Sequence, residues 1–181
     1  MKKKVCLSVA AIALVLCCAI GGTLAWLSTR TGTVENTFTV GDINIDLTET
    51  TKNYKMVPGN KINKDPKVTV KAGSEACWLF VKVEKSDNFD DFMNCETADG
   101  WTELAGETGV YYRKVSATAA DTDFAVLKDN KVTVKETVTK QMLKVLTDNT
   151  YPRLTFTAYA VQQDNITDVT KAWEAAKTAQ D

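Results

Sequence analysis

Apolar and polar residues alternate along much of the chain after residue 40. Ile43, Ile45 and Leu47 alternate with polar residues, which is typical of a β-strand with one buried face. In the longer stretch 77–85, the apolar residues at 79, 81 and 83 share one face and Lys82 lies on the other. The same pattern predicts further strands over 67–71, 110–115, 124–127, 131–135 and 154–161. The sequence therefore predicts an all-β domain.

Two stretches depart from this alternation. Residues 137–146 fit neither the helical nor the strand period, so a short helix and a continued strand both remain open. Near the end, Thr167 or Asp168 can cap a helix whose apolar residues include Val169, Ala172, Trp173 and Ala176. We expect this helix to pack on the β-domain with Trp173 as its anchor.

The N-terminus has the pattern of an export signal. Three lysines at positions 2–4 precede an uncharged apolar run over 5–20, and the small residues Thr23 and Ala25 precede Trp26. We therefore expect a signal peptide over 1–25, with cleavage between Ala25 and Trp26, and a single secreted domain over 26–181. A retained membrane anchor is an alternative, because no charge interrupts residues 5–29 and about 20 residues are enough to cross a bilayer. A lipoprotein modified at Cys17 or Cys18 is a third, weaker one.

Several motifs resemble a known family. They are the sequences GGTLAWLS over 21–28 and NTFTVGDI over 36–43, supported by LTFTAYAVQ over 154–162. These resemble the TasA/camelysin family, which Gram-positive bacteria export through the signal peptidase SipW. The resemblance implies a jelly-roll-like antiparallel β-sandwich, secreted to the cell surface or the biofilm matrix, with members that polymerise into fibres. It also brings a metallopeptidase label from camelysin.

Length and charge limit the possible functions. Removing 25 residues from 181 leaves 156, which suits one domain with a sizeable core. Without the three leader lysines, 19 of the 22 basic residues remain against 23 acidic ones, a net charge near −4. No basic cluster with interleaved aromatic residues occurs in this part of the sequence. This mild acidity disfavours nucleic acid as a partner.

The absence of histidine decides the search for catalytic residues. With no histidine in the sequence, a Ser-His-Asp triad, a Cys-His pair and a His-Glu-x-x-His zinc helix are all excluded. Cys77 and Cys95, the cysteines of the exported part, can form a disulfide or remain two unlinked thiols, and without histidine they do not make a zinc site. We therefore expect no enzyme, no catalytic residues, no metal and no cofactor.

Two weaker features suggest a ligand. The acidic run over 87–91 can bind calcium or serve as a solvated loop, although it lacks the spacing of an EF-hand. Trp101, Tyr111 and Tyr112 can stack on sugars, or can fill the core.

The segment that follows the predicted cleavage site carries the functional hypothesis. Residues 26–40 contain no proline and few charges, and are capable of forming a β-strand. Such a segment can add to the sheet edge of a neighbouring copy, which gives a head-to-tail contact, or can serve as this subunit's own first strand. The apolar residues of this possible donor strand are Trp26, Leu27, Val34, Phe38 and Val40.

We therefore expect a secreted structural protein that self-assembles, as the resemblance also implies. Its partners are other copies of itself and a SipW-like signal peptidase, and its only membrane contact is through an uncleaved leader. The alternative is a monomeric cell-surface module that binds a glycan or a host protein.

Overall fold

The computed structural model describes residues 42–50 and 55–178, which belong to one compact unit, Val40–Asp181. Short, threonine-rich strands joined by polar turns form most of this unit, as β-branched residues favour a pleated surface. Its strands are β1 (Ile45–Thr48), β2 (Lys61–Asn63), β3 (Lys67–Val70), β4 (Cys77–Lys85), β5 (Met93–Asn94), β6 (Thr102–Glu103), β7 (Val110–Val115), β8 (Thr122–Ala125), β9 (Lys131–Val134) and β10 (Leu154–Gln162). Its helices are α2 (Phe89–Phe92), the 3-10 turn η1 (Lys128–Asn130), α3 (Lys140–Lys144) and α4 (Val169–Thr178).

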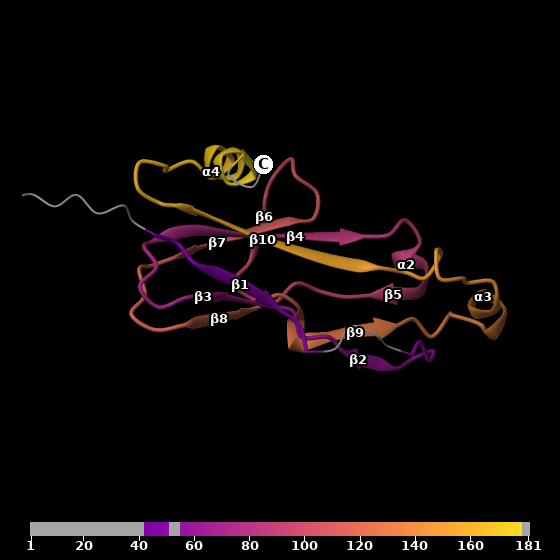
Figure 1. Ribbon diagram of the computed structural model, residues 1–181. Coiled ribbons are helices and arrows are strands. Elements are labelled where there is room, and N and C mark those ends of the chain that lie inside the picture. Colours follow the sequence, from indigo (N-terminus) through magenta and orange to yellow (C-terminus); the bar gives the residue numbers. More distant parts are fainter. Residues whose placement is uncertain (1–41, 51–54, 179–181) are drawn as a thin grey trace, which may run out of the picture. The chain divides into compact units, whose positions relative to one another are not determined.

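The strands form three sheets whose pairs are all antiparallel. A four-stranded sheet has the order β10-β4-β7-β6, and two three-stranded sheets have the orders β1-β3-β8 and β2-β9-β5. The nine-residue strands β4 and β10 pair along their whole length, from Cys77 opposite Gln162 to Lys85 opposite Leu154. The two smaller sheets follow one another along the face of the long one (Figure 1).

The main core lies between the four-stranded sheet and the β1-β3-β8 sheet. Val68 and Val70 of β3 pack against Leu79 and Val81 of β4, and all four are fully buried. These residues occupy alternate positions on their strands, so their side chains point into one layer. The predicted antiparallel β-sandwich is confirmed.

The outer face of the four-stranded sheet is covered by α4. Asp168 caps this helix, because its carboxylate accepts a hydrogen bond of 3.0 Å from the backbone N–H of Lys171. The ring of Trp173 packs at 5.3 Å from that of Phe80 and at 5.0 Å from that of Tyr159, centroid to centroid. The predicted C-terminal helix and its Trp173 anchor are confirmed.

Some elements differ from the sequence prediction. The first five residues of β4 are buried on both faces, because Trp78 and Phe80 face α4 while Leu79 faces the sandwich core. Within 137–146 the structure has the helix α3, capped by Thr139, and not a strand. The strand predicted over 124–127 lies two residues earlier, as β8. The short strands β2, β5 and β6 were not predicted, because two or three residues are too few to show a period.

Gly109 fixes the approach of the β6–β7 turn to β4. Its φ of +76° is in the left-handed region, and a Cβ at this position would lie 2.5 Å from the carbonyl oxygen of Val83. We expect Gly109→Ala to lower the free energy of unfolding by about 2–5 kcal/mol, since left-handed strain and overpacking add. Urea unfolding followed by far-ultraviolet circular dichroism measures this loss.

Gly106 provides the matched control for this substitution. Its φ is +86°, but nothing lies within 4 Å of the place where a Cβ would stand. Gly106→Ala should therefore cost only the backbone strain, about 1–2 kcal/mol. Equal losses for the two alanine variants would contradict the role of the contact with Val83.

Candidate functional site

An open groove of about 780 Å³ lies between β2 and the first residues of β10. Both strands are outer strands of their sheets in the described part of the chain, so the two layers are not closed by a further strand there. The groove is lined by apolar residues and by a smaller polar set: Met56, Ile62, Phe89, Met93, Val132, Leu143, Tyr151, Pro152 and Leu154, with Lys55, Lys64, Asp148, Arg153 and Thr155.

The local sequence explains why the inside of the groove is apolar. On β9, alternation directs Val132 and Val134 inward and leaves Lys131 and Thr133 toward the outside. Phe89 of α2 is buried beside Val132 in one cluster of core residues, and Met93 of β5 lies between this cluster and the next. Apolar residues from β5, β9 and α2 thus line the same open space.

Charged residues of the rim are held by specific partners. Lys64 forms an ion pair of 2.6 Å with Glu49, and both side chains are largely buried. The guanidinium of Arg153 donates to the backbone oxygen of Asp148 at 2.9 Å, and its backbone N–H donates to the hydroxyl of Ser86 at 2.9 Å. The positions of these two cations are therefore set by the fold.

Apolar side chains exposed to solvent lie around the same end of the sandwich. Val57, next to Met56, is 47% exposed, Tyr151 is 47% exposed, and Val145, at the end of α3, is 71% exposed. They are three of the four exposed large hydrophobic residues in the part of the chain that the structure describes. Apolar surface gathered beside an apolar groove indicates a site for a partner.

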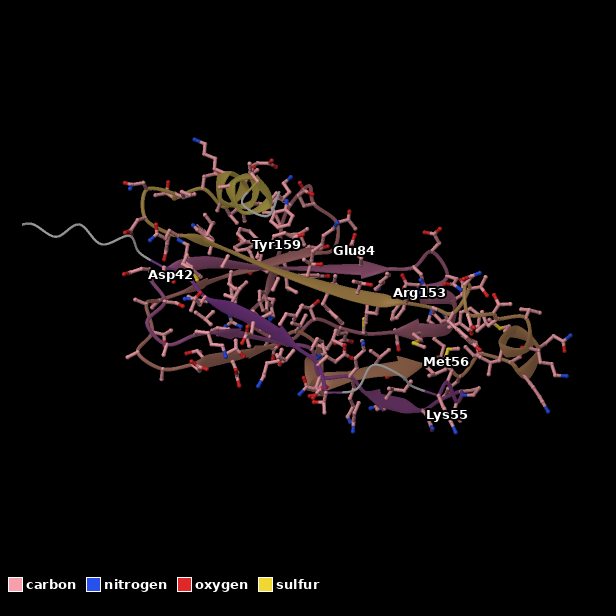
Figure 2. The ribbon with its side chains drawn as sticks, viewed as in Figure 1. Asp42, Lys55, Met56, Glu84, Arg153 and Tyr159 are labelled. Atoms are coloured by element: carbon pink, nitrogen blue, oxygen red, sulfur yellow. The ribbon has the colours of Figure 1, made fainter. Side chains whose placement is uncertain are left out.

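The described chain begins at the opposite end of the sandwich. The backbone oxygen of Asp42 accepts a hydrogen bond from Glu75, in the turn before β4, near the end of β10 that pairs with Cys77. The groove is lined by the other end of β10. Eight residue steps along a strand separate the two ends by about 26 Å. Figure 2 labels Asp42 at one end, and Lys55, Met56 and Arg153 at the other.

Cys77 and Cys95 are free thiols, so the disulfide considered from the sequence is not formed. Cys77 begins β4, whereas Cys95 follows β5 and lies near Lys85, at the far end of β4. A separation on the scale of a nine-residue strand exceeds the reach of a disulfide. Burial raises the pKa of the Cys77 thiol to about 11 and raises that of Cys95 as well.

The acidic run over 87–91 is divided between several roles. Asp90 forms an ion pair of 2.9 Å with Lys85, and the side-chain amide of Asn88 donates to the backbone oxygen of Thr150. Within residues 42–50 and 55–178, no three acidic, cysteine or histidine side chains are grouped so that they could hold a metal ion. In the structure the run forms a turn and the first residues of α2.

The aromatic residues considered for sugar binding take part in packing. The indole N–H of Trp101 donates to the backbone oxygen of Ala125 at 2.8 Å, and its ring lies over the guanidinium of Arg113. Tyr111 packs against the sandwich core, and Tyr112 packs against the α4 cluster on the other face of the sheet. The three rings do not form one continuous platform.

The remaining predicted positions lie outside the described residues. These are the cleavage residues Ala25 and Trp26 and the donor-strand residues Leu27, Val34, Phe38 and Val40. The groove itself was missed from the sequence, since its residues come from five separate segments. The pair Met56 and Val57, two apolar residues in a stretch without alternation, was the one local signal. None of the helices in the described segments has the length and apolar character needed to cross a membrane.

Comparison with known proteins identifies the family. The family model described as camelysin metallo-endopeptidase matches residues 1–150, which include most of the groove. No curated protein and no solved structure matches the chain. A match over more than four-fifths of the 181 residues is decisive, and the chain belongs to the TasA/camelysin family.

Proposed function

We propose that this protein is a secreted structural protein of the cell surface or biofilm matrix, whose copies assemble head to tail. In this proposal a SipW-like peptidase removes residues 1–25, and residues 26–40 of one copy enter the groove of the next. The observation that carries the proposal is the apolar groove between two outer strands. Family membership fits an exported protein of this kind.

The shape of the groove suits an extended segment. A strand added beside β10 or β2 gains main-chain hydrogen bonds from the strand edge, and its alternate side chains fill apolar pockets. A volume of about 780 Å³ is within the range of sites that bury a ligand. In the donor segment, Val34, Phe38 and Val40 fall on even positions and so share one face of a strand.

The positions of donor and acceptor favour a chain of subunits. The donor segment precedes Asp42, at one end of β10, and the groove lies at the other end. Donor and acceptor surfaces are different, so after one contact forms the pair still has one free donor segment and one free groove. Such a heterologous contact propagates into a filament.

The metallo-endopeptidase description in the family does not fit the residues of this chain. Zinc peptidases bind the metal largely through histidine, and the sequence has none. Cys77 is buried, with a raised pKa that disfavours the thiolate a metal needs, and is remote from Cys95. We therefore propose a non-enzymatic role.

A monomeric binding module is the second candidate. The size of the groove favours it, because pockets of several hundred Å³ also take small ligands. The packing of Trp101, Tyr111 and Tyr112 gives no support to a sugar platform. The two candidates differ in whether copies associate.

Assembly after removal of residues 26–40 tests the proposal. The chain starting at Trp26 should form fibres in negative-stain electron microscopy and sediment increasingly with concentration. The chain starting at Gly41 should remain monomeric with the same far-ultraviolet circular dichroism, since every described strand is retained.

A variant that keeps the whole segment over 26–40 tests whether its apolar side chains, and not only its presence, are needed for assembly. The chain starting at Trp26 with Val34→Asp and Phe38→Asp keeps the segment but removes its apolar face, and should also stay monomeric. Monodisperse particles from the unaltered chain would overturn strand donation and leave the monomeric binding module.

A further inference from the structure

Every methionine in the described residues lies in one apolar cluster beside the groove. Met56, Met93 and Met142 pack around Phe92 and Val134, and all three are partly exposed. Met56 and Met93 also line the groove itself. The remaining methionine of the sequence is Met1, outside the described part. The groove is thus the place where thioether chemistry is concentrated.

A thioether gives the groove two properties. Met is unbranched and polarisable, so it adjusts to side chains of different shape. It is also readily oxidised to the sulfoxide, which is polar. Both lining residues are partly exposed, and we expect a small oxidant to reach their sulfur atoms.

We propose that hydrogen peroxide closes the groove to its partner strand by oxidising Met56 and Met93. This inference rests on the proposed function, because it concerns the regulation of the same groove. In each step a sulfur–oxygen bond forms and the peroxide O–O bond breaks. The sulfur loses two electrons to give the sulfoxide, and the second peroxide oxygen leaves as water.

The surroundings of the two sulfur atoms explain why oxidation opposes occupation. In the empty groove a sulfoxide oxygen is solvated by water. In the occupied groove it would be enclosed with Ile62, Val132 and Leu143, which offer no hydrogen-bond donor from their side chains. A modification that disfavours only the occupied state shifts the equilibrium toward free subunits.

Two of the three cations that line the groove, Lys64 and Arg153, are already engaged, whereas the third, Lys55, is exposed at the rim. Lys64 is held by Glu49 at 2.6 Å, and a guanidinium nitrogen of Arg153 donates to Asp148. For either residue to donate a hydrogen bond to a sulfoxide oxygen, its present contact would have to be replaced. The fold therefore does not provide a ready donor from these two residues.

Peroxide treatment of the chain starting at Trp26 tests the inference. Mass spectrometry of peptides should show sulfoxide at Met56 and Met93. The concentration at which half of the protein sediments should rise tenfold or more, and methionine sulfoxide reductases with a thiol reductant should restore it. Unchanged assembly of protein oxidised at both sites would overturn the inference.

Leucine variants assign the effect to the groove. Met56→Leu/Met93→Leu should assemble as before and become insensitive to peroxide, because leucine is apolar and cannot be oxidised at sulfur. Met142 is in the cluster but does not line the groove, so assembly of the Met142→Leu variant should remain sensitive to peroxide. If peroxide impaired the assembly of the double variant as much as that of the unaltered chain, the inference would be overturned.

A dye measurement separates this inference from strand donation. The non-assembling variant Val34→Asp/Phe38→Asp leaves the groove unaltered, and the apolar dye bis-ANS should bind there and fluoresce. Peroxide should reduce this fluorescence at least threefold, and Met56→Leu/Met93→Leu in the same background should prevent the reduction. If the untreated chain forms no fibres, strand donation fails, and this dye result alone decides whether oxidation closes the groove.

Discussion

Replacing Val57 and Tyr151 by glutamate is expected to raise the concentration needed for assembly about 100-fold while the monomer stays folded. Both side chains are about half exposed, so their substitution should change the free energy of unfolding by no more than about 0.5 kcal/mol. In the assembled state each carboxylate would face the apolar segment of the next copy. Enclosing an unpaired polar group costs about 1–3 kcal/mol, and two such costs correspond to roughly a hundredfold change.

Sedimentation over a concentration series measures this shift, and thermal melting checks the fold. Ala105→Glu/Thr108→Glu is the matched control, because it adds the same two charges at exposed positions of the β6–β7 turn, on the opposite edge of the four-stranded sheet from β10. Impaired assembly in both double variants would point to net charge as the cause. If Val57→Glu/Tyr151→Glu assembled as well as the unaltered chain, these two rim residues would not be part of the interface.

Trp173→Ala is expected to lower the free energy of unfolding by about 3–5 kcal/mol, as truncation of a large core aromatic residue does. Trp173 is 2% exposed and contacts the rings of Phe80 and Tyr159. Its loss would leave a cavity between α4 and the sheet and uncover that face of β4. Urea unfolding followed by circular dichroism measures the change without relying on tryptophan fluorescence.

Trp173→Phe is the control for this substitution. The indole N–H of Trp173 is buried and has no hydrogen-bond partner within the described structure, so removing it leaves no acceptor unsatisfied. A phenyl ring retains most of the packing, and we expect a loss of less than about 1.5 kcal/mol. Equal losses for the alanine and phenylalanine variants would show that packing of the ring is not what holds α4.

The sandwich could be predicted from the sequence because one buried face imposes a period of two on each strand. Ile43, just before β1, and Ile45, at its start, carry this signal, and so do Val68 and Val70 in β3, whereas Leu47, predicted on the same buried face, is 37% exposed. The burial of Trp78 on the second face of β4 could not be predicted in this way, because it depends on the cluster around Trp173, ninety-five residues away. A pattern within one strand does not say which distant element covers it.

The groove escaped prediction for a similar reason. Met56, Phe89 and Leu154 meet only because β2, α2 and β10 come together at one end of the sandwich. Whether the two cysteines form a disulfide also depended on their positions in space. Cys77 lies at the start of β4, and Cys95 lies near its end. A pattern carried by a single segment, such as the export signal predicted over 1–25, can be read from the sequence alone, and it stays a prediction.

The pairing of β10 with β4 sets the order in which the parts of the domain can form. These strands join residues 154–162 to residues 77–85, so the long sheet cannot close until the chain has been supplied as far as residue 162. In the export that we propose, the segment over 26–40 would leave first and β10 near the end. A donor segment would then be presented well before its own chain has a groove, and the tip of a growing fibre could capture it while the rest is still folding.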